Sequence, residues 1–208
     1  SGIHSLRAGT GHSFGHTGGF LVRPQKVIEL MILMPDKLER LVRDILVAVN
    51  VNNENARLVA AHLVAADLTG HHTHGVHRLP RCVDEIRRGE VNLSAQLTVV
   101  EERPASLLID GDWGLGPVIA MQTIDLLIEK TRQQGVASAG AFHANDVGRL
   151  GGYTYHLAQQ GLLGIMTLND GGGSPLIAPW GGIAPLFSTN PLSFAAPRDG
   201  KPPISKKI

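Results

Sequence analysis

The residues best suited to chemistry lie in a histidine-rich stretch, residues 67–80, which holds four of the chain's ten histidines. His74 and Arg78 are four positions apart, so a helix that begins near Gly75 would project both from nearly one face. A guanidinium can bind a planar carboxylate through two parallel hydrogen bonds, and an imidazole can exchange a proton with an oxygen on the adjacent carbon. The pair therefore fits a small organic acid, and the simpler alternative is a capped, solvated loop at a helix start.

The same histidines could instead form a metal site. His74 and His77 are three positions apart and could share an ion on one face of a helix. Their spacing matches no established ligand pattern such as H-E-x-x-H, and no nearby carboxylate completes the ligand set. We therefore expect no metal here.

Composition is typical of a globular protein. The 208 residues are 43% hydrophobic and 18% charged, and the net charge of +1 provides no basic surface for nucleic acid. We expect no membrane association, because no apolar run reaches the roughly 18 residues that span a bilayer. The single cysteine, Cys82, allows no internal disulfide, so we expect a reducing, cytoplasmic environment.

Apolar residues at helical spacing predict an N-terminal helical unit that would position the histidines. Asp36 is the predicted cap of the first helix, and Asn52 or Asn53 that of the second. Pro80 fits the third helix only in its first turn or at a kink. We interpret His62, on the apolar stripe of the second helix, as a packed or partly exposed bystander. The three predicted helices cover residues 36–49, 53–70 and 75–88.

The first 33 residues differ from this unit in composition. They are rich in Gly, His and Ser, and contain no acidic residue before Glu29. A transit peptide would form an amphipathic helix, which the many glycines disfavour. We interpret residues 1–33 as a poorly ordered extension or tag, and Met34 as the natural start.

From residue 97 onward the pattern changes to short strands and glycine-rich turns. The glycines at 111, 114 and 116 follow a strand and precede a helix, but their spacing is not G-x-G-x-x-G, so we reject a Rossmann fingerprint. We interpret Trp113 in this turn as a wedge between layers. The predicted strands cover residues 97–100, 106–109, 136–142, 162–168 and 188–195, and the predicted helices are 117–134 and one that ends near Gly161.

A glycine-rich loop follows the strand predicted at 162–168. Residues 169–175 read NDGGGSP, and bare backbone amides of this kind can approach a phosphate. The alternative is a flexible connection without a ligand.

Motif order and spacing from residue 36 to 197 resemble the malate/L-lactate dehydrogenase family, which is unrelated to the Rossmann lactate dehydrogenases. The resemblance implies an α/β fold, in which an N-terminal helical unit is followed by a non-Rossmann mixed, largely antiparallel sheet domain with flanking helices. It also implies hydride transfer between NAD or NADP and a small 2-oxo or 2-hydroxy acid in a homodimer. The motifs that carry it are AADLTG at 65–70, THGVHRLP at 73–80, DGDWGLG at 110–116, PWGG at 179–182 and TNP at 189–191.

The resemblance assigns roles to individual residues. His74 becomes the general acid that protonates the C2 oxygen during reduction, Arg78 the clamp for the carboxylate, and Thr73 a residue that orients the imidazole. The helical substrate and dimerisation unit would span residues 34–96, and an incomplete cofactor-binding domain residues 97–208. The expected cofactor-binding residues are Asn169, Asp170, Gly171, Thr189, Asn190 and Pro191.

The chain departs from the family pattern at two places. Where many members have a histidine in N-H-x-G, this chain has Asp146, which we count as a catalytic candidate. If Asp146 faces His74 it would fix the imidazole tautomer, and if it faces a substrate carboxylate it would repel it; His143 is a candidate replacement for the imidazole. The family's sequence also continues past TNP into another cofactor motif, which leaves a truncated binding or oligomerisation module as the alternative function.

Overall fold

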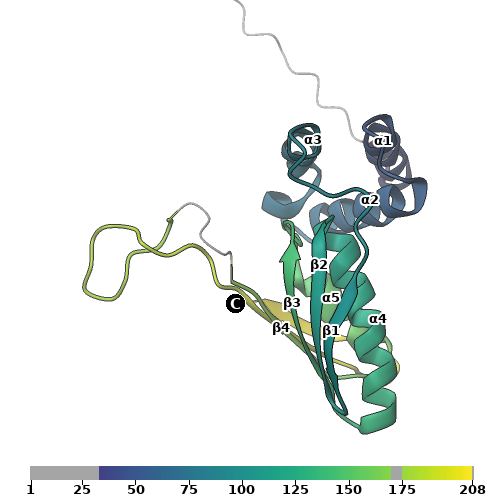
Figure 1. Ribbon diagram of the computed structural model, residues 1–208, viewed down its shortest axis with the longest axis vertical. Coiled ribbons are helices and arrows are strands. Elements are labelled where there is room, and N and C mark those ends of the chain that lie inside the picture. Colours follow the sequence, from purple (N-terminus) through teal and green to yellow (C-terminus); the bar gives the residue numbers. More distant parts are fainter. Residues whose placement is uncertain (1–32, 170–174, 208) are drawn as a thin grey trace, which may run out of the picture. The chain divides into compact units, whose positions relative to one another are not determined.

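The computed structural model describes residues 33–169 and 175–207 of the chain. The described helices and strands all belong to one compact unit, Leu33–Ile208. They form an α/β fold with flanking helices and sheets that are mixed or antiparallel (Figure 1), so the predicted fold class is confirmed. The proposed extension lies outside the described residues except for Leu33, and the boundary at residue 96 stays a prediction.

Two helices open the described part of the chain, the amphipathic α1 (Pro35–Ala48) and α2 (Asn53–Leu68). The cap predicted for α1 was wrong, because Pro35 already occupies the first turn and Met34 is the N-cap. Asp36 instead lies in that turn, where its carboxylate accepts a hydrogen bond from Arg40 at 3.0 Å. The cap predicted for α2 is confirmed, since the Asn52 side chain accepts from the Asn55 amide at 2.9 Å.

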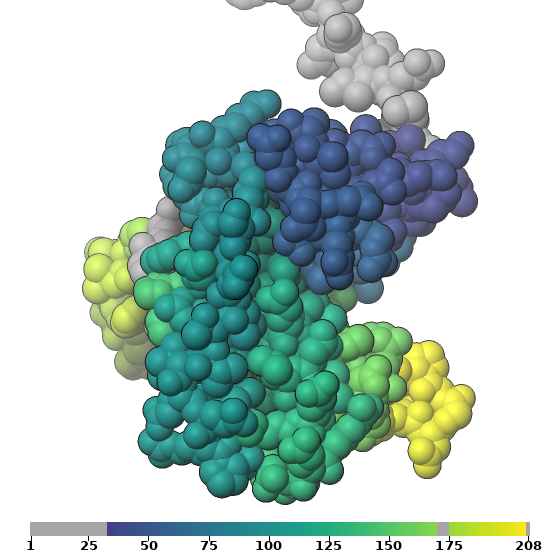
Figure 2. Space-filling view, turned by 45° about the vertical axis from the view of Figure 1, so that its right-hand side comes forward, coloured from purple at the N-terminus to yellow at the C-terminus, as the bar shows by residue number. Residues whose placement is uncertain are grey.

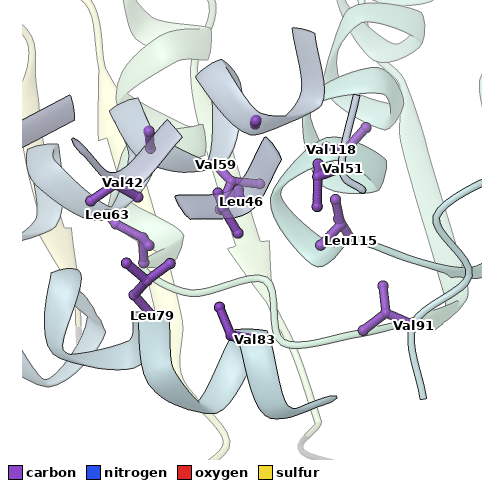
Figure 3. Packing of buried hydrophobic residues seen from close by; sticks show 12 residues of the cluster. Val42, Leu46, Val51, Val59, Leu63, Leu79, Val83, Val91, Leu115 and Val118 are labelled. Atoms are coloured by element: carbon purple, nitrogen blue, oxygen red, sulfur yellow. The ribbon is translucent and has the colours of Figure 1, made fainter. Parts of the chain in front are cut away.

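The first hydrophobic core joins these helices to the region that follows them (Figure 3). Leu46 is completely buried, and it packs in a cluster that also contains Leu115 and Val118 from the start of α4 (Gly116–Gln134). Burial of a Leu or Val side chain typically contributes about 1.5–3 kcal/mol. This shared core fixes the helices against the residues that enter α4. Its other buried members are Val42, Val51, Ala56, Val59, Ala60, Leu63, Leu79, Val83 and Val91.

The third helix is shorter than the sequence predicts. Two 3-10 turns, His72–His74 and Val76–Arg78, precede α3, which spans only Leu79–Arg87. Pro80 lies at the start of α3, where its missing N–H and fixed φ are tolerated. His74 and Arg78 therefore do not share a continuous α-helix, and the predicted basis for their proximity was wrong.

One three-stranded sheet contains β1 (Thr98–Arg103), β2 (Ser106–Gly114) and β3 (Ser138–Ala144), in that order. β1 and β2 form an antiparallel hairpin, whereas β2 and β3 are parallel. Parallel neighbours need a long crossover, which α4 supplies as it packs against both strands. Gly135, with φ of 80°, ends α4 in the left-handed conformation, directly after the predicted end of the helix at residue 134.

The turn at the end of β2 places Trp113 on the surface. Asp112 and Trp113 both have positive φ, 49° and 53°, and Trp113 is 54% exposed. Its ring stacks on His143, with the ring centroids 4.9 Å apart. The interpretation of Trp113 as a wedge between layers was therefore wrong.

A second three-stranded sheet is antiparallel and consists of β4 (Gly164–Thr167), β5 (Leu192–Ala196) and β6 (Ile204–Lys207). Helix α5 (Leu150–Gln159) packs against all three strands. In this contact the Thr154 and Ser193 hydroxyl oxygens, both buried, lie 2.8 Å apart. The sequence did not predict β6, which is drawn in yellow at the surface in Figure 2.

Helices α4 and α5 share a second core, in which Tyr153 is completely buried. The hydroxyl of Tyr153 donates to the Val147 carbonyl, which ties α5 to the loop before it. Among the described residues, no helix has the length and apolar character to cross a membrane.

Candidate active site

A pocket lies among α2, the 3-10 turns, α3, the start of α4 and the loop that precedes α5. His74, Arg78 and Asp146, the three predicted catalytic residues, all line it. Its other polar lining residues are His62, Arg81, Glu85 and Asn145, and its apolar ones are Val59, Leu63, Cys82, Val91, Leu115 and Pro117.

Asp67, at the end of α2, holds the turn that carries the histidines. One of its carboxylate oxygens accepts a hydrogen bond from the Val76 amide at 2.8 Å, and the other lies 2.9 Å from His72 Nδ1. The carboxylate packs directly on Gly75, where an added Cβ would lie 2.0 Å from Oδ1. The glycine of the Thr-His-Gly motif is therefore required by close packing.

Thr73 contacts both functional side chains of this turn. Its hydroxyl lies 3.0 Å from His74 Nδ1, and its carbonyl accepts from Arg78 Nε at 2.8 Å. These short contacts within the turn bring His74 and Arg78 to the same pocket without a shared helix face. The predicted contact between Thr73 and the imidazole is present.

Asp146 faces Arg78 from the loop before α5. Its Oδ2 lies 3.0 Å from Arg78 Nη1, and its Oδ1 accepts from the Gly148 amide at 2.9 Å. The Arg78 side chain is 27% exposed and that of Asp146 is 40% exposed, so the ion pair lies at the edge of solvent. The carboxylate thus faces the guanidinium that the sequence predicts as a substrate clamp.

The loop that carries Asp146 is anchored on both sides. The Asn145 side-chain amide donates to the carbonyls of Trp113 and Gly114 at 2.6 and 3.1 Å. On the other side, the Arg149 amide donates to His62 Nε2 at 3.0 Å. These bonds connect the loop to β2 and to α2, and so hold Asp146 opposite Arg78.

His62 has a larger role than the sequence predicted. Its ring stacks on Tyr153, with the centroids 5.0 Å apart, and it lines the pocket. Burial and then the positive charge of Arg149 lower the pKa of His62 from 6.5 to about 4, although Asp146 acts in the opposite direction. His62 is therefore neutral at pH 7 and can accept the Arg149 hydrogen bond. The one sequence signal was its position on the apolar stripe of α2.

This lowered pKa predicts a loss of stability in acid. Between pH 6.5 and about 4, the unfolded chain binds a proton at His62 that the folded chain does not. Lowering the pH from 7 to 4.5 should reduce the free energy of unfolding by about 2–3 kcal/mol more in the wild type than in His62→Gln. Urea unfolding at the two pH values measures this difference. His77→Gln, at an exposed histidine, should behave as wild type, and an equal pH dependence in His62→Gln would contradict the prediction.

Cys82 lies one turn beyond Arg78 on α3 and lines the same pocket. Burial raises the pKa of its thiol to about 11, and the Glu85 carboxylate adds to this effect. The thiol therefore remains protonated at neutral pH and acts as a small, weakly polar wall residue. It is poorly suited to nucleophilic chemistry.

The described residues among the predicted cofactor ligands lie elsewhere, at one end of the strands of the second sheet. Thr167, at the end of β4, pairs with Leu192 at the start of β5, and its hydroxyl donates to the Pro191 carbonyl at 3.0 Å. In this register Asn169, which follows β4, lies at the same end of the sheet as Thr189 and Asn190, which precede β5. All three side chains are exposed, and their amides and hydroxyl suit hydrogen bonding to a dinucleotide. Asp170 and Gly171 lie outside the described residues.

His143, the proposed substitute for the family histidine, does not line the pocket. Its Nδ1 lies 3.1 Å from Asp110 Oδ1, and its ring packs between Trp113 and Phe142. It belongs to a separate surface group at the end of β2 and β3. Across residues 33–169 and 175–207, no three His, Cys, Asp or Glu side chains form a group that could hold a metal ion.

Comparison with known proteins gives consistent matches. The model of the family described as malate/L-lactate dehydrogenase matches residues 33–205. Malate dehydrogenase of Pyrococcus horikoshii is 41% identical over 167 residues, which cover 80% of this chain and 46% of that protein. L-sulfolactate dehydrogenase of Methanocaldococcus jannaschii is 34% identical over 165 residues, 79% of this chain and 47% of that protein.

Solved structures agree with the sequence matches. The structure of malate dehydrogenase from Pyrococcus horikoshii superimposes with a TM-score of 0.80 at 38% identity, and covers 86% of this chain and 50% of that one. The chain thus spans about half the length of the relatives that it matches.

Proposed function

The chain belongs to the malate/L-lactate dehydrogenase family, and from this premise we propose that it transfers hydride between NAD or NADP and a small 2-oxo or 2-hydroxy acid. The observation that carries the proposal is the convergence of His74 and Arg78 on one pocket, with Thr73 in contact with both. An acid group and a carboxylate ligand placed together match the needs of a 2-oxo acid.

In this proposal Arg78 binds the C1 carboxylate, and the bound acid then presents its C2 oxygen to His74. Because Nδ1 of His74 contacts Thr73, we assign proton transfer to Nε2. During reduction His74 donates a proton to the C2 oxygen, and during oxidation it accepts the proton from the hydroxyl. Holding the donor and the clamp in fixed positions reduces the entropic cost of alignment.

A bound nicotinamide would accept or supply the hydride at C2. Asn169, Thr189 and Asn190 are the described residues whose side chains would hold such a dinucleotide, with Asp170 and Gly171 of the following loop as further candidates. We further propose that the working protein is a cytoplasmic homodimer. These assignments follow the family resemblance, since relatives of this type are named as malate and sulfolactate dehydrogenases.

A test of the proposed function compares a 2-oxo acid with its neutral counterpart. The purified chain is assayed by nicotinamide absorbance with 2-oxobutanoate and with its methyl ester, which keeps the carbonyl but lacks the charge. A hydrogen bond to a charged group contributes about 1.5–3 kcal/mol, so kcat/KM should favour the acid by about 10- to 100-fold. Absence of turnover, together with no binding of NADH, NADPH or either compound by calorimetry, would instead favour the binding or oligomerisation module.

A further inference from the structure

Both arginines that line the pocket already contact a carboxylate of the chain. Arg78 pairs with Asp146 at 3.0 Å, and Arg81 pairs with Glu85 at 2.6 Å. A third guanidinium in the same region, that of Arg149, does not line the pocket. Within the described part of the chain, the pocket therefore presents no arginine or lysine without a carboxylate partner for a ligand with several negative charges.

Asp146 is held firmly in its position. Each of its carboxylate oxygens has a partner, the Gly148 amide at 2.9 Å and the Arg78 guanidinium at 3.0 Å. On either side of Asp146, the Asn145 side chain donates to β2 and the Arg149 amide donates to His62 on α2. A ligand therefore meets a fixed negative charge next to the guanidinium that would bind it.

This ion pair restricts how Arg78 can bind a carboxylate. Its Nε donates to the Thr73 carbonyl and its Nη1 to Asp146. Two parallel hydrogen bonds to a ligand carboxylate would need two donors on one edge of the guanidinium. An incoming carboxylate must share Arg78 with Asp146 or displace it. A second carboxylate on the same small molecule is repelled by Asp146, and it gains no contact with an additional cation.

We propose that Asp146 is a specificity-determining residue that makes the pocket prefer 2-oxo acids with one carboxylate over dicarboxylates. This inference rests on the proposed function, because it assumes that Arg78 binds the substrate carboxylate. The inference concerns whether the bound 2-oxo acid has one carboxylate or two, a property that neither the Thr-His-Gly motif nor the fold determines. The Asp146 carboxylate acts as a permanent competitor for the clamp.

The test uses two acids of equal chain length that differ only at their far end. 2-Oxopentanoate carries a methyl group where 2-oxoglutarate carries a second carboxylate. Calorimetric titration of the purified chain should give a Kd at least about tenfold lower for 2-oxopentanoate, which corresponds to about 1.4 kcal/mol. Asp146→Asn, which keeps an acceptor for the Gly148 amide, should reduce this preference about tenfold, chiefly by lowering the Kd of 2-oxoglutarate.

Two further variants test whether the preference depends on the negative charge at residue 146. Asp146→Ser removes the charge with a smaller side chain and should shift the preference in the same direction. Asp84→Asn changes the same charge at an exposed position on α3 outside the pocket, and should leave the preference unchanged. If both acids bind but Asp146→Asn and Asp146→Ser leave their ratio at the wild-type value, the inference is overturned while the proposed function stands. If neither acid binds any of the proteins, both are overturned.

Discussion

Replacement of His74 by glutamine is expected to lower kcat/KM for reduction of a 2-oxo acid by about 100- to 10,000-fold, the usual contribution of a positioned general acid. Glutamine can still form hydrogen bonds in the pocket, but it has no proton to transfer at neutral pH. The loss should lie mainly in kcat, because the carboxylate of the substrate still binds to Arg78. Steady-state kinetics with a nicotinamide cofactor separate the two parameters.

A neighbouring histidine provides the matched control. His77 lies in the 3-10 turn after Gly75, is exposed and does not line the pocket. His77→Gln should retain kcat and KM within about twofold, which would correspond to less than about 0.5 kcal/mol. A His74→Gln protein with wild-type kcat would reject the assignment of His74 as the proton donor.

Gly116→Ala should have the largest effect on folding. A Cβ at Gly116 would lie 2.2 Å from the Asp146 carbonyl oxygen and 2.4 Å from that of Asn145. Both are backbone atoms in the loop that is bonded to β2 and α2, so neither can move without breaking those bonds. We expect a loss of about 3 kcal/mol in the free energy of unfolding, at the upper end for overpacking in a core. Urea unfolding measures it directly.

The same substitution at Gly140 is the control for glycine removal. Gly140 lies in β3, and the nearest atom to its added Cβ is Leu108 Cδ1 at 3.6 Å, an ordinary contact distance. Gly140→Ala should stay within about 1 kcal/mol of wild type, as most substitutions without a clash do. Equal losses in the two variants would show that the close approach of Gly116 to the loop has no special importance for stability.

The helices were predictable because their signals are local. Apolar spacing located α1, α2 and α4, and Asn52 marked the start of α2. The strands were harder, because their pairing depends on residues far away in the sequence. β2 pairs with β3 across the whole of α4, and β6 is a short strand whose presence depends on pairing with β5.

Three of the residues that line the pocket were predictable, but its geometry was not. The proximity of His74 and Arg78 was anticipated from an α-helical face, whereas it results from 3-10 turns held by Asp67. The bond between His62 and the Arg149 amide joins residues 87 positions apart. Such a contact has no local pattern, and neither does the pairing of Arg78 with Asp146.

The pocket wall contains charged residues and apolar residues, and the two kinds differ in how freely they could change during evolution. The charged residues Arg78 and Asp146 are bonded to each other, to the Thr73 carbonyl and to the Gly148 amide, so changes among them would disturb several bonds together. The apolar residues Val59, Cys82 and Val91 line the same pocket, and variation in their volume changes the room left for a substrate's side chain. New substrate preferences by size could therefore arise through single mutations that leave the proton donor and the clamp intact.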